Sequence, residues 1–170
     1  MSKTLSPEGF FLLYAFPAIN HCSPNLAAGE LSLLETMAIH GEQPSLERLQ
    51  KIFPRAFQRI AKFTGKTSKY SLQDFKTYWW TEHNRIIEKR EGGYELATLE
   101  EAELCKVSFP IVKQAQGKIV TVSYPQGVEK KGINYRNLPL LSGQRVSMHK
   151  GHIIEIVPEG IYSAYFSHAH

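Results

Sequence analysis

Apolar residues recur at the spacing of an α-helix throughout residues 1–98. Apolar side chains three or four positions apart form one stripe on a helix, and that stripe packs against a core. Capping residues, Pro and Gly divide the stretch into about four to five helices. We predict helices over residues 7–16, 24–40, 45–64 and 72–91, with Pro54 breaking or kinking the third.

Beyond Thr98 the pattern changes from helical periodicity to short runs rich in β-branched residues. Gly, Pro and Ser separate these runs, as is typical of strands joined by tight turns. Four or five short strands within about 55 residues can protect their edges by closing into a small barrel. The predicted strands are residues 104–109, 118–124, 132–137, 145–149 and 152–157, with a turn at 114–117.

These patterns predict an α+β protein in two domains. Residues 1–98 form a helical domain, and residues 99–170 form a small antiparallel β-barrel-like domain. A chain of 170 residues buries roughly 70% of its extended surface on folding, so its core needs no staple. Two cysteines cannot form a disulfide framework, which fits a reducing compartment.

The charge distribution and the apolar stretches indicate where in the cell the protein is expected. Residues 1–98 carry 12 Lys and Arg against 10 Asp and Glu, and residues 99–170 carry 8 against 6, so neither domain is a basic arm. The most apolar stretch, residues 10–19, is too short for a membrane span of about 20 residues. No small-residue cleavage site follows it cleanly. We expect a cytoplasmic protein that does not enter a membrane.

His21 and Cys22 lie between the first two predicted helices. Ser23-Pro24 predicts that the second helix starts directly after Cys22. Free N–H groups at a helix N-terminus and a neighbouring imidazole both lower a thiol pKa, and a thiolate binds metal or attacks an electrophile. The alternative is that Cys22 is a small buried hydrophobic residue under the loop.

Cys105 and His149 have less distinctive surroundings. Cys105 alternates with apolar neighbours in a predicted strand, so we expect it in the core. His149 and His152 flank Lys150-Gly151 at the join of two strands, where their rings either converge or stay in solvent. The chain has no CxxC and no helical HxxxH signature for a metal site.

The adjacent tryptophans Trp79 and Trp80 are unusual. Neighbouring side chains on a helix point about 100° apart, so the two rings cannot face one core from the same side. We predict that one of them lies at a seam between the domains or at a partner surface. The alternative is that both cover the helical core from two sides.

The residues alone leave three classes of function open. One is a non-enzymatic binding protein, which we favour over an enzyme because no GxSxG, phosphate loop or glycine fingerprint is present. Another is a nucleic-acid-binding module that uses a basic β face with Lys130, Lys131 and Arg136. The third is a thiol-dependent enzyme with Cys22 as nucleophile and His21 or His149 as base.

Several short motifs resemble one uncharacterised family. Residues 11–17, FLLYAFP, followed by Cys22 and Pro24, are similar to the opening of a family encoded beside hydrogenase maturation genes. Tyr78-Trp79 with Asn84, residues 105–109, and residues 146–149 with Gly151 follow in the order of that family. The C-terminal half also resembles the small-barrel hydrogenase assembly chaperones of the HypC/HupF type.

The resemblance implies an accessory or assembly factor in the maturation of a [NiFe]-hydrogenase or a related metalloenzyme. It implies Cys22 as the functional thiol and His149 as a second site residue, with His21, Trp79 and Asn84 beside them. Cys22 and His149 would then be the metal ligands, holding iron or nickel transiently. The expected partner is a hydrogenase large subunit or another maturation factor, and not a nucleic acid. Ser23 departs from the family pattern, which has glycine after the cysteine.

Overall fold

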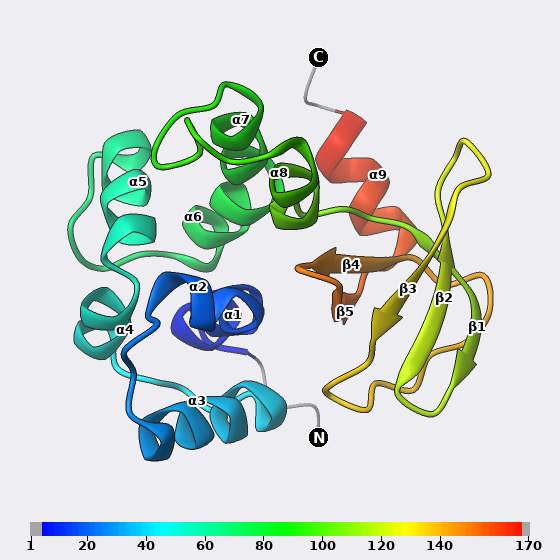
Figure 1. Ribbon diagram of the computed structural model, residues 1–170, viewed down its shortest axis with the longest axis horizontal. Helices are drawn as coiled ribbons and strands as arrows, with labels where there is room; N and C mark the ends of the chain where they lie inside the picture. Colours follow the sequence, from blue (N-terminus) through cyan, green and yellow to red (C-terminus); the bar gives the residue numbers. More distant parts are fainter. Residues whose placement is uncertain (1–4, 168–170) are drawn as a thin grey trace. The chain divides into compact units, whose positions relative to one another are not determined.

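The computed structural model describes residues 5–167 and has the predicted α+β architecture. The chain folds into two compact units, a helical unit that ends at Lys106 and a sheet unit that begins at Val107 (Figure 1). The boundary therefore follows residue 106, whereas the change of periodicity placed it after residue 98. No helix within residues 5–167 is both long and apolar enough to cross a membrane.

Several helices of the helical unit begin at capping side chains. The Ser6 hydroxyl accepts a hydrogen bond from the Gly9 N–H at 3.0 Å, and Ser71 forms a reciprocal capping box with Asp74. The unit contains α1 (Pro7–Ala15), the 3₁₀ turn η1 (Phe16–Ala18), α2 (Ile19–Cys22), α3 (Ala28–His40), α4 (Leu46–Ile52), α5 (Pro54–Thr64), α6 (Leu72–Thr77), the π-helical turn η2 (Tyr78–Glu82), α7 (His83–Glu88) and α8 (Leu99–Cys105).

Helix α1 is the centre of this unit. Every residue of α1 from Gly9 to Ala15 is buried, and α3, α4 and α6 all contact it (Figure 1). The Phe11 ring lies 4.7 Å from the Phe57 ring and 5.2 Å from the Phe75 ring. Burial of one such side chain stabilises the fold by about 1.5–3 kcal/mol, so α1 is the main hydrophobic anchor of the unit.

Pro54 breaks the third predicted helix, as the sequence indicated, so residues 46–64 form α4 and α5. The start of the second predicted helix differs from the prediction. Helix α3 begins at Ala28 and not at Ser23-Pro24, because Ser23 is not an N-cap. The Ser23 hydroxyl instead donates to the Ile52 carbonyl, and residues 23–27 form a turn in which the Leu26 N–H donates to the Ser23 carbonyl.

The predicted strand at residues 104–109 is wrong, because its first residues belong to α8. Thr98 and Glu101 form a capping box that starts this helix. This S/T-x-x-E signal is local and outweighs the strand-like pattern that follows it. Cys105 is the last residue of α8 and is buried, as expected for a core cysteine.

The sheet unit has five strands and one terminal helix. The β4–β5 hairpin lies where the sequence predicted it, whereas β1 begins after the predicted first strand and β3 ends before most of the predicted third. The elements are β1 (Ile111–Gln116), β2 (Ile119–Ser123), β3 (Glu129–Ile133), β4 (Val146–His149), β5 (His152–Ile156) and α9 (Glu159–Ser167), with strand order β1-β2-β3-β5-β4.

The sheet is open and partly parallel, so the prediction of an antiparallel barrel is wrong. Strands β3 and β5 pair in parallel at Ile133 and His152, because residues 134–145 lead the chain across to β4 before it turns back as β5. Strands β1 and β4 stand at the ends of the order. Two isolated bridges, Ser108–Met148 and Ile111–Arg145, protect part of these edges.

The core of the sheet unit lies on one face of the strands. Gly132 of β3 is buried against this core, and a Cβ atom there would lie 2.7 Å from Met148 Cε and 3.1 Å from Ile153 Cδ1. The glycine therefore makes room for two neighbouring side chains. The buried core residues are Val112, Val120, Val122, Val146, Met148 and Ile153.

Gly132→Val should destabilise the sheet unit. The added side chain overlaps Met148 and Ile153, and overpacking of this kind lowers the free energy of unfolding by about 1–3 kcal/mol. Gly160→Ala is the matched control, because a Cβ there meets no atom within 4 Å. Urea unfolding of both variants checks the prediction, and a Gly132→Val protein as stable as the control would contradict it.

Candidate functional site

Cys22 is an exposed thiol at the end of α2, and Cys105 is a buried thiol. This difference is the one predicted from their sequence surroundings. His21, the neighbour of Cys22, is exposed as well. The alternative interpretation of Cys22 as a buried packing residue is therefore wrong. Cys22 is the cysteine that a reagent or a partner can reach from solvent.

No helix begins directly after Cys22, although the sequence predicted one there. Helix α3 starts at Ala28, so its unpaired N–H groups lie beyond the turn of residues 23–27. Cys22 instead ends α2, where helix carbonyls and not N–H groups are left unpaired. The sequence argument for stabilising a thiolate by a helix N-terminus does not apply to Cys22.

The residues directly after Cys22 line a surface pocket of about 280 Å³. One wall is the turn that follows Cys22, and the opposite wall comes from α4. Arg48 and Glu30 form an ion pair of 3.1 Å at this pocket. An exposed thiol beside a hollow of mixed polarity can contact a segment seated in that hollow. The lining residues are Ser23, Pro24, Asn25, Leu26, Glu30, Arg48, Lys51 and Ile52.

A second group of polar side chains lies inside the helical unit. We call Arg59, Tyr78, His83 and Tyr94 the Arg59 cluster. The Arg59 guanidinium carbon lies 5.1 Å from the centre of the Tyr94 ring. The His83 ring lies 5.7 Å from the Tyr78 ring and 6.2 Å from the Tyr94 ring. The cluster joins α5, η2, α7 and the loop after α7.

Hydrogen bonds to the backbone hold the cluster in place. Arg59 donates to the Gly92 carbonyl. His83 Nε2 donates to the Cys105 carbonyl at 2.9 Å, which ties α7 to the end of α8. The Gly92-Gly93 turn passes close to Arg59, with φ of 62° and 103°. A Cβ on Gly92 would lie 3.0 Å from Arg59 Nε, so glycine makes this close approach possible.

The two phenols of the cluster are shifted towards their neutral forms. Burial raises the pKa of Tyr78, and the charge of Cys22 raises it further, while the Arg59 cation opposes both. Burial and the charge of Cys105 likewise raise the pKa of Tyr94, again against Arg59. The two thiols therefore act on the Arg59 cluster through different tyrosines.

Arg59 itself stays charged. Burial alone lowers the pKa of its guanidinium, but the neighbouring phenols Tyr78 and Tyr94 outweigh that effect and raise it above its ordinary value. The Tyr78 hydroxyl is buried beside this guanidinium. The cluster thus holds a permanent cation among neutral polar groups.

The π-helical turn η2 explains how adjacent tryptophans fit one core. A π turn inserts an extra residue into a helix and redirects the side chains around it. The Trp79 ring stacks on Tyr14 at 5.8 Å, and Trp80 Nε1 donates to the Tyr14 hydroxyl at 2.8 Å. Both rings belong to the helical core, as the alternative interpretation expects. Trp79 is buried. Its predicted role beside Cys22 stays a prediction.

The remaining predicted site residues are divided between the two units. Asn84 is half-buried on α7 of the helical unit. His149 is buried in β4 of the sheet unit, just before the Lys150-Gly151 turn with φ of 50° and 74°. Within residues 5–167 no three His, Cys, Asp or Glu side chains are grouped as a metal site. The metal role of Cys22 and His149 stays a prediction.

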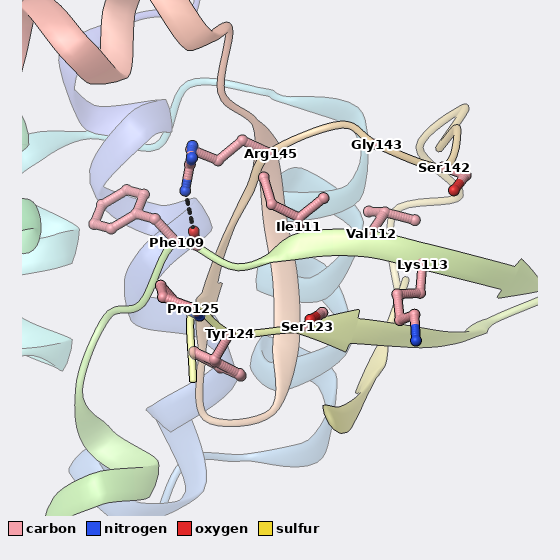
Figure 2. Close-up of a pocket in the computed structure, with 10 residues that line it drawn as sticks. All are labelled: Phe109, Ile111, Val112, Lys113, Ser123, Tyr124, Pro125, Ser142, Gly143 and Arg145. Atoms are coloured by element: carbon pink, nitrogen blue, oxygen red, sulfur yellow. Dashed lines mark hydrogen bonds between the residues drawn. The ribbon is translucent and has the colours of Figure 1, made fainter. Parts of the chain in front are cut away.

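The sheet unit has a pocket of about 480 Å³ (Figure 2). Arg145 reaches towards Phe109 at one end of the pocket and donates to its carbonyl at 2.7 Å (Figure 2). Arg145 also donates to both carboxylate oxygens of Glu159 in α9. These bonds lower the pKa of Glu159 and pair the Arg145 charge within the unit.

The predicted basic β face is partly used for structure. Arg136 donates to the Ile154 carbonyl at 2.8 Å, so its charge points at the backbone. Lys130 lies over the Tyr124 ring at 5.4 Å, and Lys131 is exposed. Burial raises the pKa of Tyr135, which is not an exposed stacking platform. Two lysines and one aromatic ring are a small surface for a single strand.

Comparison with known proteins gives no match: no family model fits the chain, and no curated protein or solved structure is significantly similar to it. The functional argument therefore depends on the geometry of this chain and on the motif resemblance. Cys22 was found from the sequence. The Arg59 cluster was missed, because its members come from four separate segments and share no motif.

Alkylation should distinguish the two thiols. At neutral pH, iodoacetamide should label Cys22 well before Cys105, because Cys22 is exposed and Cys105 is 3% exposed. Mass spectrometry of digested samples over time measures both reactions. Cys22→Ser should abolish the fast phase without unfolding the protein, and Cys105→Ser should leave it. Faster labelling of Cys105 would contradict the assignment.

Alkaline pH should destabilise the protein partly through Tyr94. Its pKa is raised above the ordinary value of 10.0, so between pH 10 and the folded-state pKa the unfolded chain loses this proton while the folded chain keeps it. The free energy of unfolding then falls by up to about 1.4 kcal/mol per pH unit from this group. Urea unfolding on either side of this range should show a smaller loss for Tyr94→Phe than for the unmodified protein. An equal loss would contradict the assignment.

Proposed function

We propose that this protein is an accessory factor in the assembly of a [NiFe]-hydrogenase or a related metalloenzyme. The proposal assigns Cys22 as the thiol that contacts a partner protein or a metal-centre precursor. The observation that carries it is the exposure of Cys22 at the end of α2, beside the pocket of residues 23–26 and α4. A partner segment in that pocket would lie next to the thiol.

The motif resemblance supports the same assignment, because the structure explains what its residues do. FLLYAFP covers most of the buried helix α1 and the start of η1. Pro17 lies in η1, and the chain then continues through α2 to Cys22. The motif therefore anchors the segment that presents the thiol. A core helix followed by an exposed cysteine is an arrangement suited to holding a partner at a defined point.

In this proposal the metal is a cargo that the protein holds for another protein, and not a permanent cofactor. Iron or nickel would be held transiently, with the Cys22 thiolate as a ligand. Thiolate is a ligand that these metals accept. The cytoplasm is the proposed location, because a free thiol persists in a reducing compartment. The proposed partner is a hydrogenase large subunit or another maturation factor.

A thiol-dependent enzyme is the second candidate. The same exposed thiol favours it, together with the adjacent pocket and with His21 as the neighbouring imidazole. In this candidate Cys22 is the nucleophile and His21 is the base. Alkylation of Cys22 that slows strongly in His21→Asn would favour the enzyme over the assembly factor.

Cys22→Ser should weaken the complex with the precursor of a hydrogenase large subunit. If the thiol is a direct contact, its loss should raise the dissociation constant by at least about tenfold, the order that one lost contact of about 1.4 kcal/mol gives. Size-exclusion chromatography and calorimetry of the full chain with the purified precursor measure the effect. Cys105→Ser is the matched control and should bind normally. Equal binding by Cys22→Ser and the unmodified protein would remove the thiol from the proposal.

A further inference from the structure

Arg59 carries a half-buried charge that no carboxylate neutralises. Among the described residues its contacts are the Gly92 carbonyl, the Tyr94 ring face and the phenols of Tyr78 and Tyr94. All of these groups are neutral at ordinary pH, and no ion pair of Arg59 occurs within residues 5–167. A buried charge is costly unless it is paired, so this guanidinium is suited to meet an external anion.

Arg59 faces a surface pocket of about 230 Å³ within the helical unit. The pocket lies between α5, the end of η2, α7 and the loop after α7. It has room for several water molecules or one small metabolite. Its lining residues are Arg59, Lys62, Phe63, Glu82, Arg85, Ile86, Glu91 and Gly92.

The charges in this pocket leave an excess of one cation. Three cationic side chains and two carboxylates line it. Arg85 is paired with Glu82 at 2.7 Å, and Arg85 also feels the charge of Glu91. Lys62 is exposed and forms no ion pair among the described residues. Arg59 and Lys62 are therefore the two charges available to a ligand.

The guanidinium is also fixed in place before any ligand arrives. The Gly92-Gly93 turn holds it from one side and the Tyr94 ring from another. A fixed guanidinium presents parallel N–H donors, which match the oxygens of a carboxylate or a phosphate. Because its orientation is already set, little side-chain entropy is lost when such a group binds.

We propose that the pocket formed by Arg59, Lys62 and Gly92 binds a small oxyanion, namely the carboxylate or phosphate group of a small metabolite. Arg59 provides the directional bonds and Lys62 provides a second charge at the pocket mouth. Phe63 and Ile86 contact the apolar part of the molecule. The site is independent of Cys22 and of the proposed assembly function.

The other large pocket does not offer the same chemistry. In the sheet-unit pocket of Figure 2, Arg145 is paired with Glu159 and Lys113 with Glu129. An anion there would have to displace a carboxylate that is already bound. In the Arg59 pocket, no carboxylate of the described residues forms an ion pair with Arg59 or Lys62. This difference selects the Arg59 pocket as the anion site.

Titration of the full chain with inorganic phosphate or acetate tests the proposal. Sodium chloride keeps the ionic strength constant, and the amide signals of Gly92 and Gly93 in ¹H–¹⁵N spectra report on the pocket. Saturable shifts with either anion are expected, and a preference for one identifies the class. If neither anion causes saturable shifts, the proposal is wrong.

Three charge variants make the test specific. Lys62→Gln should weaken binding by at least about fivefold, as expected for loss of a charge-assisted bond. Glu91→Gln should strengthen it, because a carboxylate that repels the anion is removed. Lys89→Gln is the matched control, since Lys89 is exposed and does not line the pocket. Equal weakening by Lys62→Gln and Lys89→Gln would show non-specific attraction and overturn the site.

Arg59→Lys tests the directional role. It keeps the charge but loses the planar donors, so it should weaken binding by at least about tenfold. Arg59 also packs on Tyr94, so this variant is compared only if its ¹H–¹⁵N spectrum shows a folded protein. Whether or not Arg59→Lys folds, the comparison of Lys62→Gln with Glu91→Gln decides whether the pocket binds the anion. Unchanged binding by a folded Arg59→Lys variant would overturn the proposed role of Arg59.

Discussion

The burial of α1 is the constraint on which the helical unit depends. Its residues from Phe10 to Ala15 are apolar on every side, and a helix of this kind is stable only when neighbours surround it completely. Helices α3, α4 and α6 contact it for this reason. The one polar atom that α1 buries deeply, the Tyr14 hydroxyl, accepts a hydrogen bond from Trp80. This bond satisfies both partners and fixes η2 against α1.

Helix α1 supports both candidate sites of the helical unit, the exposed Cys22 thiol and the Arg59 cluster. The segment after α1 runs through η1 and α2 and ends with Cys22 in solvent. The π turn η2, held by Tyr14, directs Tyr78 towards Arg59 and begins the helix that carries His83. A single buried helix thus positions an exposed thiol and a partly buried cation. Substitutions in α1 would affect both sites without contacting either.

Local signals in the sequence predicted more than distant ones. The caps at Ser6 and Ser71, the break at Pro54 and the β4–β5 hairpin all follow from a few neighbouring residues, and all are present. The predicted start of α3 at Ser23-Pro24 was wrong, because the Ser23 hydroxyl donates to the carbonyl of Ile52, which is 29 residues away. The prediction of a closed barrel was wrong, because the order of strands depends on crossover connections, and hydrophobic periodicity does not encode these connections. The candidate site divides in the same way. Cys22 was visible between two helices, and the Arg59 cluster exists only after folding.

Burial decides the protonation state of Tyr78, which lies near charges from both sites. Desolvation is the largest influence on its pKa and raises it, the Arg59 cation lowers it, and the charge of Cys22 raises it. The pKa stays above its ordinary value, so this phenol is neutral at ordinary pH. A neutral phenol can pack inside the helical core beside the Arg59 cation without a second buried charge. The packing that buries Tyr78 is therefore also what keeps the surroundings of Arg59 uncharged.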